Sequence, residues 1–61
     1  MDIINAPYSD YEYEFTVVKP LDGDTYEFIG YYTNGFKAEE KALEVGGVIL
    51  HNVRITGKVA K

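Results

Sequence analysis

The stretch YEYEFTVVKPLDGDTYEFIGYY, residues 11–32, decides the fold that we expect of this chain. Its first part, residues 11–18, places an aromatic or aliphatic side chain at every second position, which is the pattern of a half-buried β-strand. Its last part, residues 25–32, is again rich in aromatic residues and predicts a second strand. Between them, residues 19–24 contain Pro and Asp-Gly, which mark a turn. The stretch therefore predicts a β-hairpin.

The hydrophobic pattern of the two strands also predicts how they pair. If Asp22 and Gly23 are the central residues of the turn, the opposed pairs are Leu21 with Asp24, Val17 with Phe28, Phe15 with Gly30 and Tyr13 with Tyr32. The apolar residues of these pairs then lie on one side of the hairpin, so the turn and the strand pattern agree. We expect the ring of Phe15 to cover the gap left by Gly30.

The following segment predicts one short helix. Residues 37–45, KAEEKALEV, are rich in helix-forming residues, and the glycines at 46–47 supply a helix stop. Ala38, Ala42 and Val45 share one face, which marks the buried side of the helix. Because a helix of about nine residues is not stable alone in water, it must pack on the sheet.

Residues 48–59 complete the expected fold with a third strand. The side chains that we expect to point inward are Ile49, Val53, Ile55 and Val59. The order strand, strand, helix, strand (β-β-α-β) predicts an α+β domain in which one helix covers one face of a three-stranded antiparallel sheet. A chain of 61 residues has room for one domain. We assign that domain to residues 11–61 and an N-terminal arm to residues 1–10.

Composition excludes several classes of function. The absence of cysteine excludes disulfides, thiol catalysis and thiolate zinc sites, and a single histidine, His51, excludes a histidine-rich metal site. No apolar run reaches the length of about 20 residues that a membrane helix needs, and we expect no signal peptide because the amino end has neither a basic nor a hydrophobic leader region. Carboxylate pairs such as Glu12/Glu14 predict solvated faces rather than a catalytic cleft. We expect a cytoplasmic protein that is not an enzyme and binds no metal or cofactor.

The chain is acidic, and its charge is unevenly distributed. The formal net charge is −4. Residues 1–35 carry seven carboxylates against one lysine, a net −6, and residues 36–61 carry three against five bases, a net +2. Nucleic-acid binding requires a basic surface, so direct binding of nucleic acid is not expected. The acidity is typical of a protein that imitates nucleic acid or that approaches a basic partner. The simpler interpretation is that the charge keeps a small protein soluble.

Six tyrosines in so short a chain provide candidates for both core and interface. We expect Tyr13, Tyr26 and Tyr32 in the core, and Tyr8, Tyr11 and Tyr31 at interfaces, where tyrosine is enriched. Stacking of single-stranded nucleic acid on the tyrosines is a further hypothesis, which the negative charge opposes.

The predicted sheet also suggests self-association. Its second face carries Val18, Ile29 and Tyr31, and a strand lies uncovered at the edge. The candidate dimer interface consists of Ile29, Tyr31, Val53 and Ile55.

The exposed side of the predicted helix is the candidate site for a partner. It carries Glu39, Glu40 and Glu44, with Phe36 at its start and Leu43 flanking the buried stripe. Carboxylates around an apolar group would present a DNA-like surface to a DNA-binding enzyme. The alternative is an ordinary solvated helix with weak pairs between neighbouring charges.

The chain resembles a family of small acidic phage proteins, the inhibitors of uracil-DNA glycosylase made by short-tailed phages of Gram-positive bacteria. The resemblance covers most of the chain. It rests on the first strand YEFTVV at 13–18, the Asp-Gly turn at 22–23, the Tyr-Glu-Phe of 26–28, the short helix closed by Gly46, and a last strand with Val-Arg-Ile at 53–55.

The resemblance implies a mechanism, a partner and a set of site residues. Members of this family are homodimers in which two helices form an apolar pocket for the leucine that the glycosylase inserts into DNA, and acidic groups around the pocket imitate phosphates. The family has a Phe-Glu pair about five residues before the helix-ending glycine, where this chain has Lys41 and Ala42. The partner-binding residues to test are therefore Phe36, Glu39, Glu40, Leu43 and Glu44.

The leading hypothesis is a homodimeric DNA mimic that blocks a host uracil-DNA glycosylase in the host cytoplasm. The alternative is a small structural or assembly protein of a mobile element that associates through Ile29, Tyr31 and its sheet edge.

Overall fold

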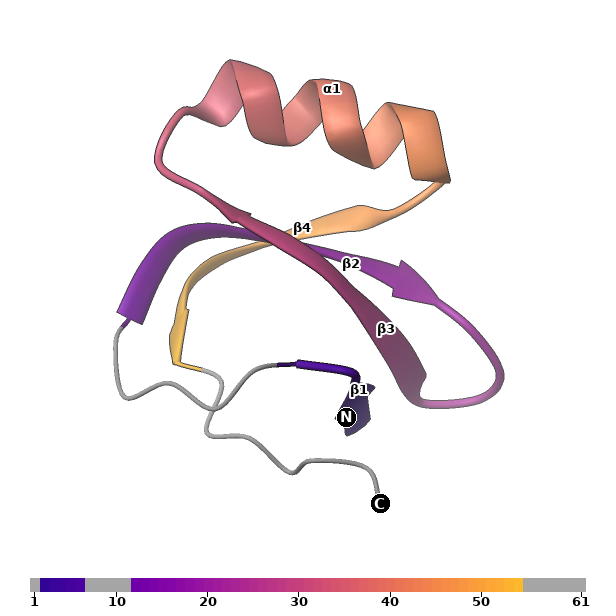
Figure 1. Ribbon diagram of the computed structural model, residues 1–61. Helices are drawn as coiled ribbons and strands as arrows, with labels where there is room; N and C mark the ends of the chain where they lie inside the picture. Colours follow the sequence, from indigo (N-terminus) through magenta and orange to yellow (C-terminus); the bar gives the residue numbers. More distant parts are fainter. Residues whose placement is uncertain (1, 7–11, 55–61) are drawn as a thin grey trace.

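The computed structural model of the chain describes residues 2–6 and 12–54, which form one mixed sheet and one helix (Figure 1). In chain order the elements are β1 (Asp2–Ile4), β2 (Glu12–Pro20), β3 (Thr25–Tyr32), α1 (Gly35–Val45) and β4 (Val48–Arg54). The four strands lie in the order β1-β3-β2-β4, and α1 crosses one face of the sheet. The α+β class expected from the sequence is confirmed.

The expectation of a three-stranded, purely antiparallel sheet was wrong because the sheet has a fourth strand. β1, which the sequence placed in an N-terminal arm, pairs in parallel with β3, so that Ile3 lies opposite Tyr26. The Asp2 amide also donates to the Asp24 carbonyl, at 3.0 Å. Three residues are too few to show an alternating pattern, whereas the unpaired edge of β3 offers them a ready set of backbone partners. As a result β3 lies inside the sheet rather than at its edge.

The hairpin between β2 and β3 forms, but its turn is one residue longer than expected. The Leu21 amide donates to the Thr25 carbonyl at 2.8 Å, and the Thr25 amide donates to the Asp22 carbonyl at 3.0 Å. Leu21 therefore pairs with Thr25 rather than with Asp24. Gly23 adopts φ +58°, which glycine reaches without strain.

A second irregularity, between Val17 and Val18, changes the pairing again. Val18 lies opposite Phe28, but Val17 lies opposite Gly30, so Ile29 is an extra residue in β3. The longer turn already moves Phe28 opposite Val18, so the predicted pair of Val17 with Phe28 was wrong. The bulge in turn places Ile29 on the helix side of the sheet instead of the far side. A β-bulge leaves no signal in an alternating pattern, which explains the error.

The aromatic ring beside Gly30 is that of Tyr32 and not, as we expected, that of Phe15. Phe15 lies opposite Tyr32, and a Cβ atom built on Gly30 would lie 3.2 Å from the Tyr32 ring. The ring of Tyr32, not that of Phe15, therefore covers the glycine.

The core between helix and sheet is small. Val17, Ala38 and Ala42 are buried at its centre. The partly buried residues packed against it are Phe15, Ile29, Tyr32, Val45 and Ile49. Tyr32 thus confirms its predicted place in the core. Tyr13 instead stacks on Tyr31, which lies opposite Thr16 on the sheet face away from the helix. Tyr26 is half-buried and lies opposite Pro20 in the ladder.

The face of the sheet away from the helix is also partly buried, since Thr16 and Val18 are both 0% exposed. Two of its hydroxyls, Thr16 Oγ1 and the Tyr31 hydroxyl, are buried with no hydrogen-bond partner among the described residues. Burial raises the pKa of the Tyr31 hydroxyl, and the neighbouring Tyr13 raises it further, so Tyr31 stays protonated at neutral pH.

The helix begins two residues before its predicted start because Asn34 caps it. Asn34 Oδ1 accepts hydrogen bonds from the Phe36 amide at 2.8 Å and from the Lys37 amide at 3.3 Å. The sequence Asn34-Gly35 had been interpreted as part of a connection, but an Asn before a helical run satisfies the free amides of the first turn. The helix ends as predicted at Gly46, whose φ is +70°.

The last strand is shorter in the described structure than the predicted segment of residues 48–59. β4 ends at Arg54 and pairs with β2, with Ile49 opposite Val17. Asn52, at φ +52°, interrupts the regular pairing near its end. Ile55 and Val59 lie outside the described residues, as do Tyr8 and Tyr11.

Candidate functional site

The outer face of α1 carries two large apolar side chains that the fold does not bury. Phe36 is 79% exposed and Leu43 is 85% exposed. They are seven residues apart, which places them on one line along the helix because an α-helix repeats every 3.6 residues. The prediction that Leu43 flanks the buried stripe was therefore wrong. Ala38 and Ala42 occupy the opposite, buried face.

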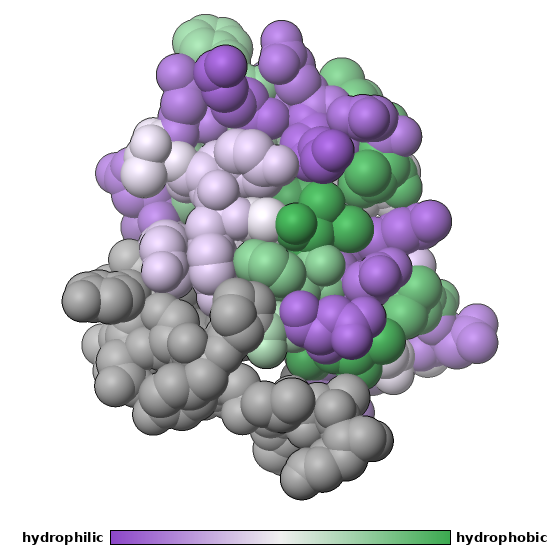
Figure 2. Space-filling view, in the orientation of Figure 1, coloured by the Kyte–Doolittle hydropathy of each residue, from purple (hydrophilic) through white to green (hydrophobic). Residues whose placement is uncertain are grey.

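Three carboxylates border this line. Glu39, Glu40 and Glu44 are all exposed. The helical repeat places Glu39 on one side of the line from Phe36 to Leu43, and Glu40 and Glu44 on the other. We call these five residues the outer face of α1. In Figure 2 the top of the molecule, where α1 runs, shows mainly hydrophilic side chains with hydrophobic ones among them. The helix thus brings together all five residues predicted to bind a partner.

The carboxylates of the outer face differ in their partners. Glu44 Oε1 lies 3.5 Å from Lys41 Nζ, one turn earlier on the exposed helix surface. Glu39 and Glu40 form no ion pair with the residues that the structure describes. The negative charge at the amino-terminal half of the outer face is therefore available to a cationic group.

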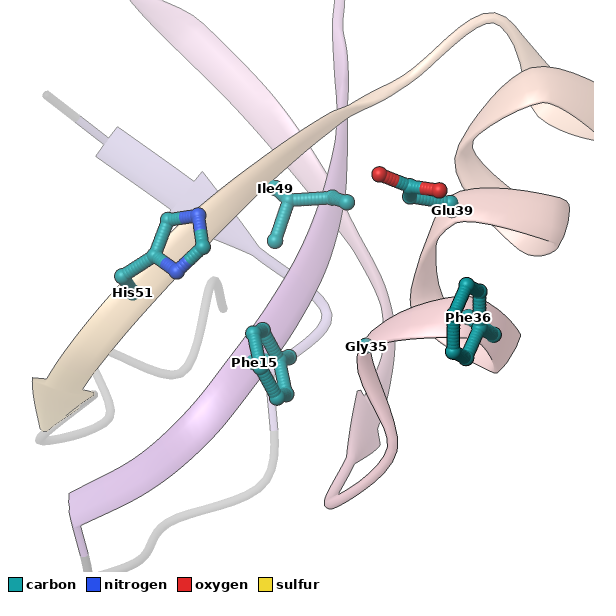
Figure 3. A pocket seen from close by; sticks show the side chains of 6 residues that line it. All are labelled: Phe15, Gly35, Phe36, Glu39, Ile49 and His51. Carbon is teal, nitrogen blue, oxygen red and sulfur yellow. The ribbon is translucent and has the colours of Figure 1, made fainter.

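An open hollow of about 310 Å³ adjoins the outer face where α1 passes over the sheet. The residues that line it are Phe15 from β2, Ile49 and His51 from β4, and Gly35, Phe36 and Glu39 from α1. Figure 3 shows the Glu39 carboxylate reaching from the helix toward Ile49, with Phe15 between the helix and His51. Two members of the outer face, Phe36 and Glu39, thus also belong to the hollow.

The floor of the hollow is positioned by β2 and β4. Phe15 lies opposite His51 in the ladder, and their rings meet edge to face, with centroids 5.3 Å apart. Gly35 leaves the space above Phe15 open, since a Cβ atom there would lie 3.4 Å from the Phe15 ring. The alternating pattern of the two strands predicted only that Phe15 and Ile49 point toward the core, not that they line a hollow. A glycine at the start of the helix was the one signal for this opening.

The four residues predicted to form a dimer interface do not share one described surface. Ile29 packs on the helix side of the sheet. Tyr31 lies on the other side, stacked on Tyr13 with ring centroids 3.6 Å apart and beside Phe28 at 4.7 Å. The backbone of Val53, in β4, pairs with Tyr13 of β2. The side chain of Val53 and all of Ile55 lie outside what the structure describes. β3, which carries Ile29 and Tyr31, lies inside the described sheet between β1 and β2. The two edges of that sheet are β1 and β4.

Metal-binding clusters and membrane-spanning helices are both absent from the described residues. Residues 2–6 and 12–54 contain no group of three or more His, Cys, Asp or Glu side chains arranged to hold a metal ion. The same part of the chain forms no helix with the length and apolar character needed to span a bilayer.

The chain matches no protein-family model, and comparisons with curated proteins and with solved structures gave no match either. Any functional assignment therefore rests on the outer face of α1 and the adjoining hollow.

Proposed function

We propose that the outer face of α1 is a protein-docking surface and that the chain inhibits a uracil-DNA glycosylase by imitating DNA. The observation that carries this proposal is the exposure of Phe36 and Leu43 on one line, bordered by Glu39, Glu40 and Glu44. Single exposed apolar residues are common on protein surfaces. Two large ones aligned on the side of a helix opposite its buried face are typical of a surface that a partner covers.

The two parts of the surface have separate roles in this proposal. The carboxylates take the place of DNA phosphates and accept charge-assisted hydrogen bonds from the enzyme's basic side chains and backbone amides. Phe36 and Leu43 add apolar burial, which contributes about 25 cal/mol per Å². The enzyme is inhibited because its DNA-binding face is occupied.

The proposal includes a homodimer. A small domain that has no cysteine to form a disulfide would gain stability from association. Two copies with neighbouring helices would also double the number of carboxylates and enlarge the apolar surface offered to the enzyme. Light scattering at micromolar concentration tests this part, and a strict monomer contradicts a site shared between two subunits.

Inhibition is tested directly by following uracil excision from DNA by a bacterial uracil-DNA glycosylase. We expect stoichiometric inhibition that weakens as salt is added, because salt screens exposed charges. The double variant Glu39→Gln/Glu40→Gln should raise the inhibitory concentration at least tenfold.

The matched control is Glu14→Gln/Asp22→Asn, which also removes two negative charges, but from exposed positions outside α1. It should inhibit like the unmodified protein. If it fails to the same extent, the effect belongs to net charge and not to the outer face. Complete excision in the presence of excess unmodified protein contradicts the proposal.

A second candidate function is assembly through the sheet edge. It is favoured by the position of β4 at one edge of the sheet that residues 2–6 and 12–54 form, because an edge strand can pair with a strand of another chain. Oligomers that survive Glu39→Gln/Glu40→Gln, together with no effect on the glycosylase, would favour this function over inhibition.

A further inference from the structure

We propose that the hollow between α1 and β4 receives an arginine side chain of the protein that docks on α1. This inference rests on the proposed function in one respect, that the outer face of α1 meets a protein. It adds which side chain of that protein is recognised, and where.

The charge inside the hollow selects the occupant. The Glu39 carboxylate points toward the hollow and has no ion-pair partner among residues 2–6 and 12–54. A purely apolar side chain would displace water from this carboxylate and leave it unpaired, which is costly. An anionic group would be repelled. A cationic side chain pairs with Glu39 while it fills the space.

The walls of the hollow favour a guanidinium over an ammonium group. The lining includes two aromatic rings, Phe15 and Phe36. A guanidinium is flat, stacks on aromatic rings and is less strongly hydrated than an ammonium ion, and its forked donors match the two oxygens of a carboxylate. The apolar stem of the side chain would lie against Ile49, with the charged end at Glu39.

The size of the hollow fits one side chain. About 310 Å³ is at the lower end of the range of ligand pockets, and this hollow is open on one side.

The experiment uses the whole labelled protein and no glycosylase. N-acetyl-arginine-methylamide is titrated into the protein, and amide chemical shifts are followed by NMR. Its neutral counterpart, with citrulline in place of arginine, has the same shape without the charge. We expect the arginine compound to shift the amides of Gly35, Phe36, Glu39 and His51, with at least tenfold weaker binding of the citrulline compound.

Two variants locate the binding. Glu39→Gln should weaken binding of the arginine compound at least tenfold, whereas Asp22→Asn, which removes one exposed carboxylate from the β2–β3 turn, should leave it unchanged. The spectra themselves report whether each variant is folded. Equal binding of the citrulline compound, or equal weakening by both variants, overturns the inference, as does tighter binding of the corresponding lysine compound.

The outcome is separable from that of the proposed function. Inhibition of the glycosylase without arginine binding removes only the inference about the hollow. Arginine binding at Glu39 without inhibition leaves a cation site on a protein-docking helix and removes the glycosylase as its target.

Discussion

The two faces of α1 use apolar residues in opposite ways. The face against the sheet buries the small residues Ala38 and Ala42, which are 0% and 8% exposed. The face toward solvent carries the large residues Phe36 and Leu43, at 79% and 85%. Small residues let the helix approach the sheet closely, whereas large ones on the outside add nothing to that packing. The comparison teaches that the inner face serves the fold and that the outer face is free to serve binding.

The largest effect should follow from making the inner face resemble the outer one. Ala38→Leu inserts a large side chain where no space exists, because Ala38 is completely buried against Val17. We expect the free energy of unfolding to fall by about 1–3 kcal/mol, the usual cost of overpacking. Urea denaturation followed by circular dichroism measures this change.

Glu40→Leu is the control, since it adds the same residue to the outer face. The free energy of unfolding should change by less than about 0.5 kcal/mol, as is usual for exposed positions. Equal losses in the two variants would show that the faces do not differ as described.

An intermediate effect should follow from removing the cap that orients both faces. Asn34→Ala removes the oxygen that accepts from the Phe36 and Lys37 amides. We expect a loss of about 1 kcal/mol in the free energy of unfolding, typical of an N-cap. Asn34→Asp keeps an acceptor there and should lose much less. An unchanged stability of Asn34→Ala would mean that the cap does not hold the first turn.

The smallest effect on stability should come from trimming the outer face. Phe36→Ala and Leu43→Ala should each change the free energy of unfolding by less than about 0.5 kcal/mol, because these side chains are exposed. Under the proposed function, both should weaken inhibition of a uracil-DNA glycosylase at least tenfold. A stability loss of about 2 kcal/mol or more, the cost of truncating a buried leucine, would place either residue in the fold rather than the site.

Most of the fold could be predicted from local patterns. The hairpin followed from alternation and an Asp-Gly turn, and the helix end followed from Gly46. The register could not be predicted, because the bulge at Ile29 and the longer turn leave the residue pattern of each strand unchanged. β1 was missed because three residues carry no detectable period.

The candidate site was predictable only in part. The exposed position of Glu39, Glu40 and Glu44 followed from the helical repeat, whereas Leu43 was expected beside the buried stripe and Phe36 just before the helix. The hollow depends on how α1 lies over β2 and β4, so neither Phe15 nor His51 could be assigned to it from spacing. The residues predicted for a dimer interface are divided for a different reason, since the bulge places Ile29 and Tyr31 on opposite sides of the sheet.

The parallel pairing of β1 with β3 has a consequence for synthesis on the ribosome. β1 is made before β3, and the residues it pairs with, Thr25 to Glu27, are made more than twenty residues later. Its backbone can find those partners only after the chain between them has emerged. This strand therefore has to wait for a later one before it takes its place in the sheet.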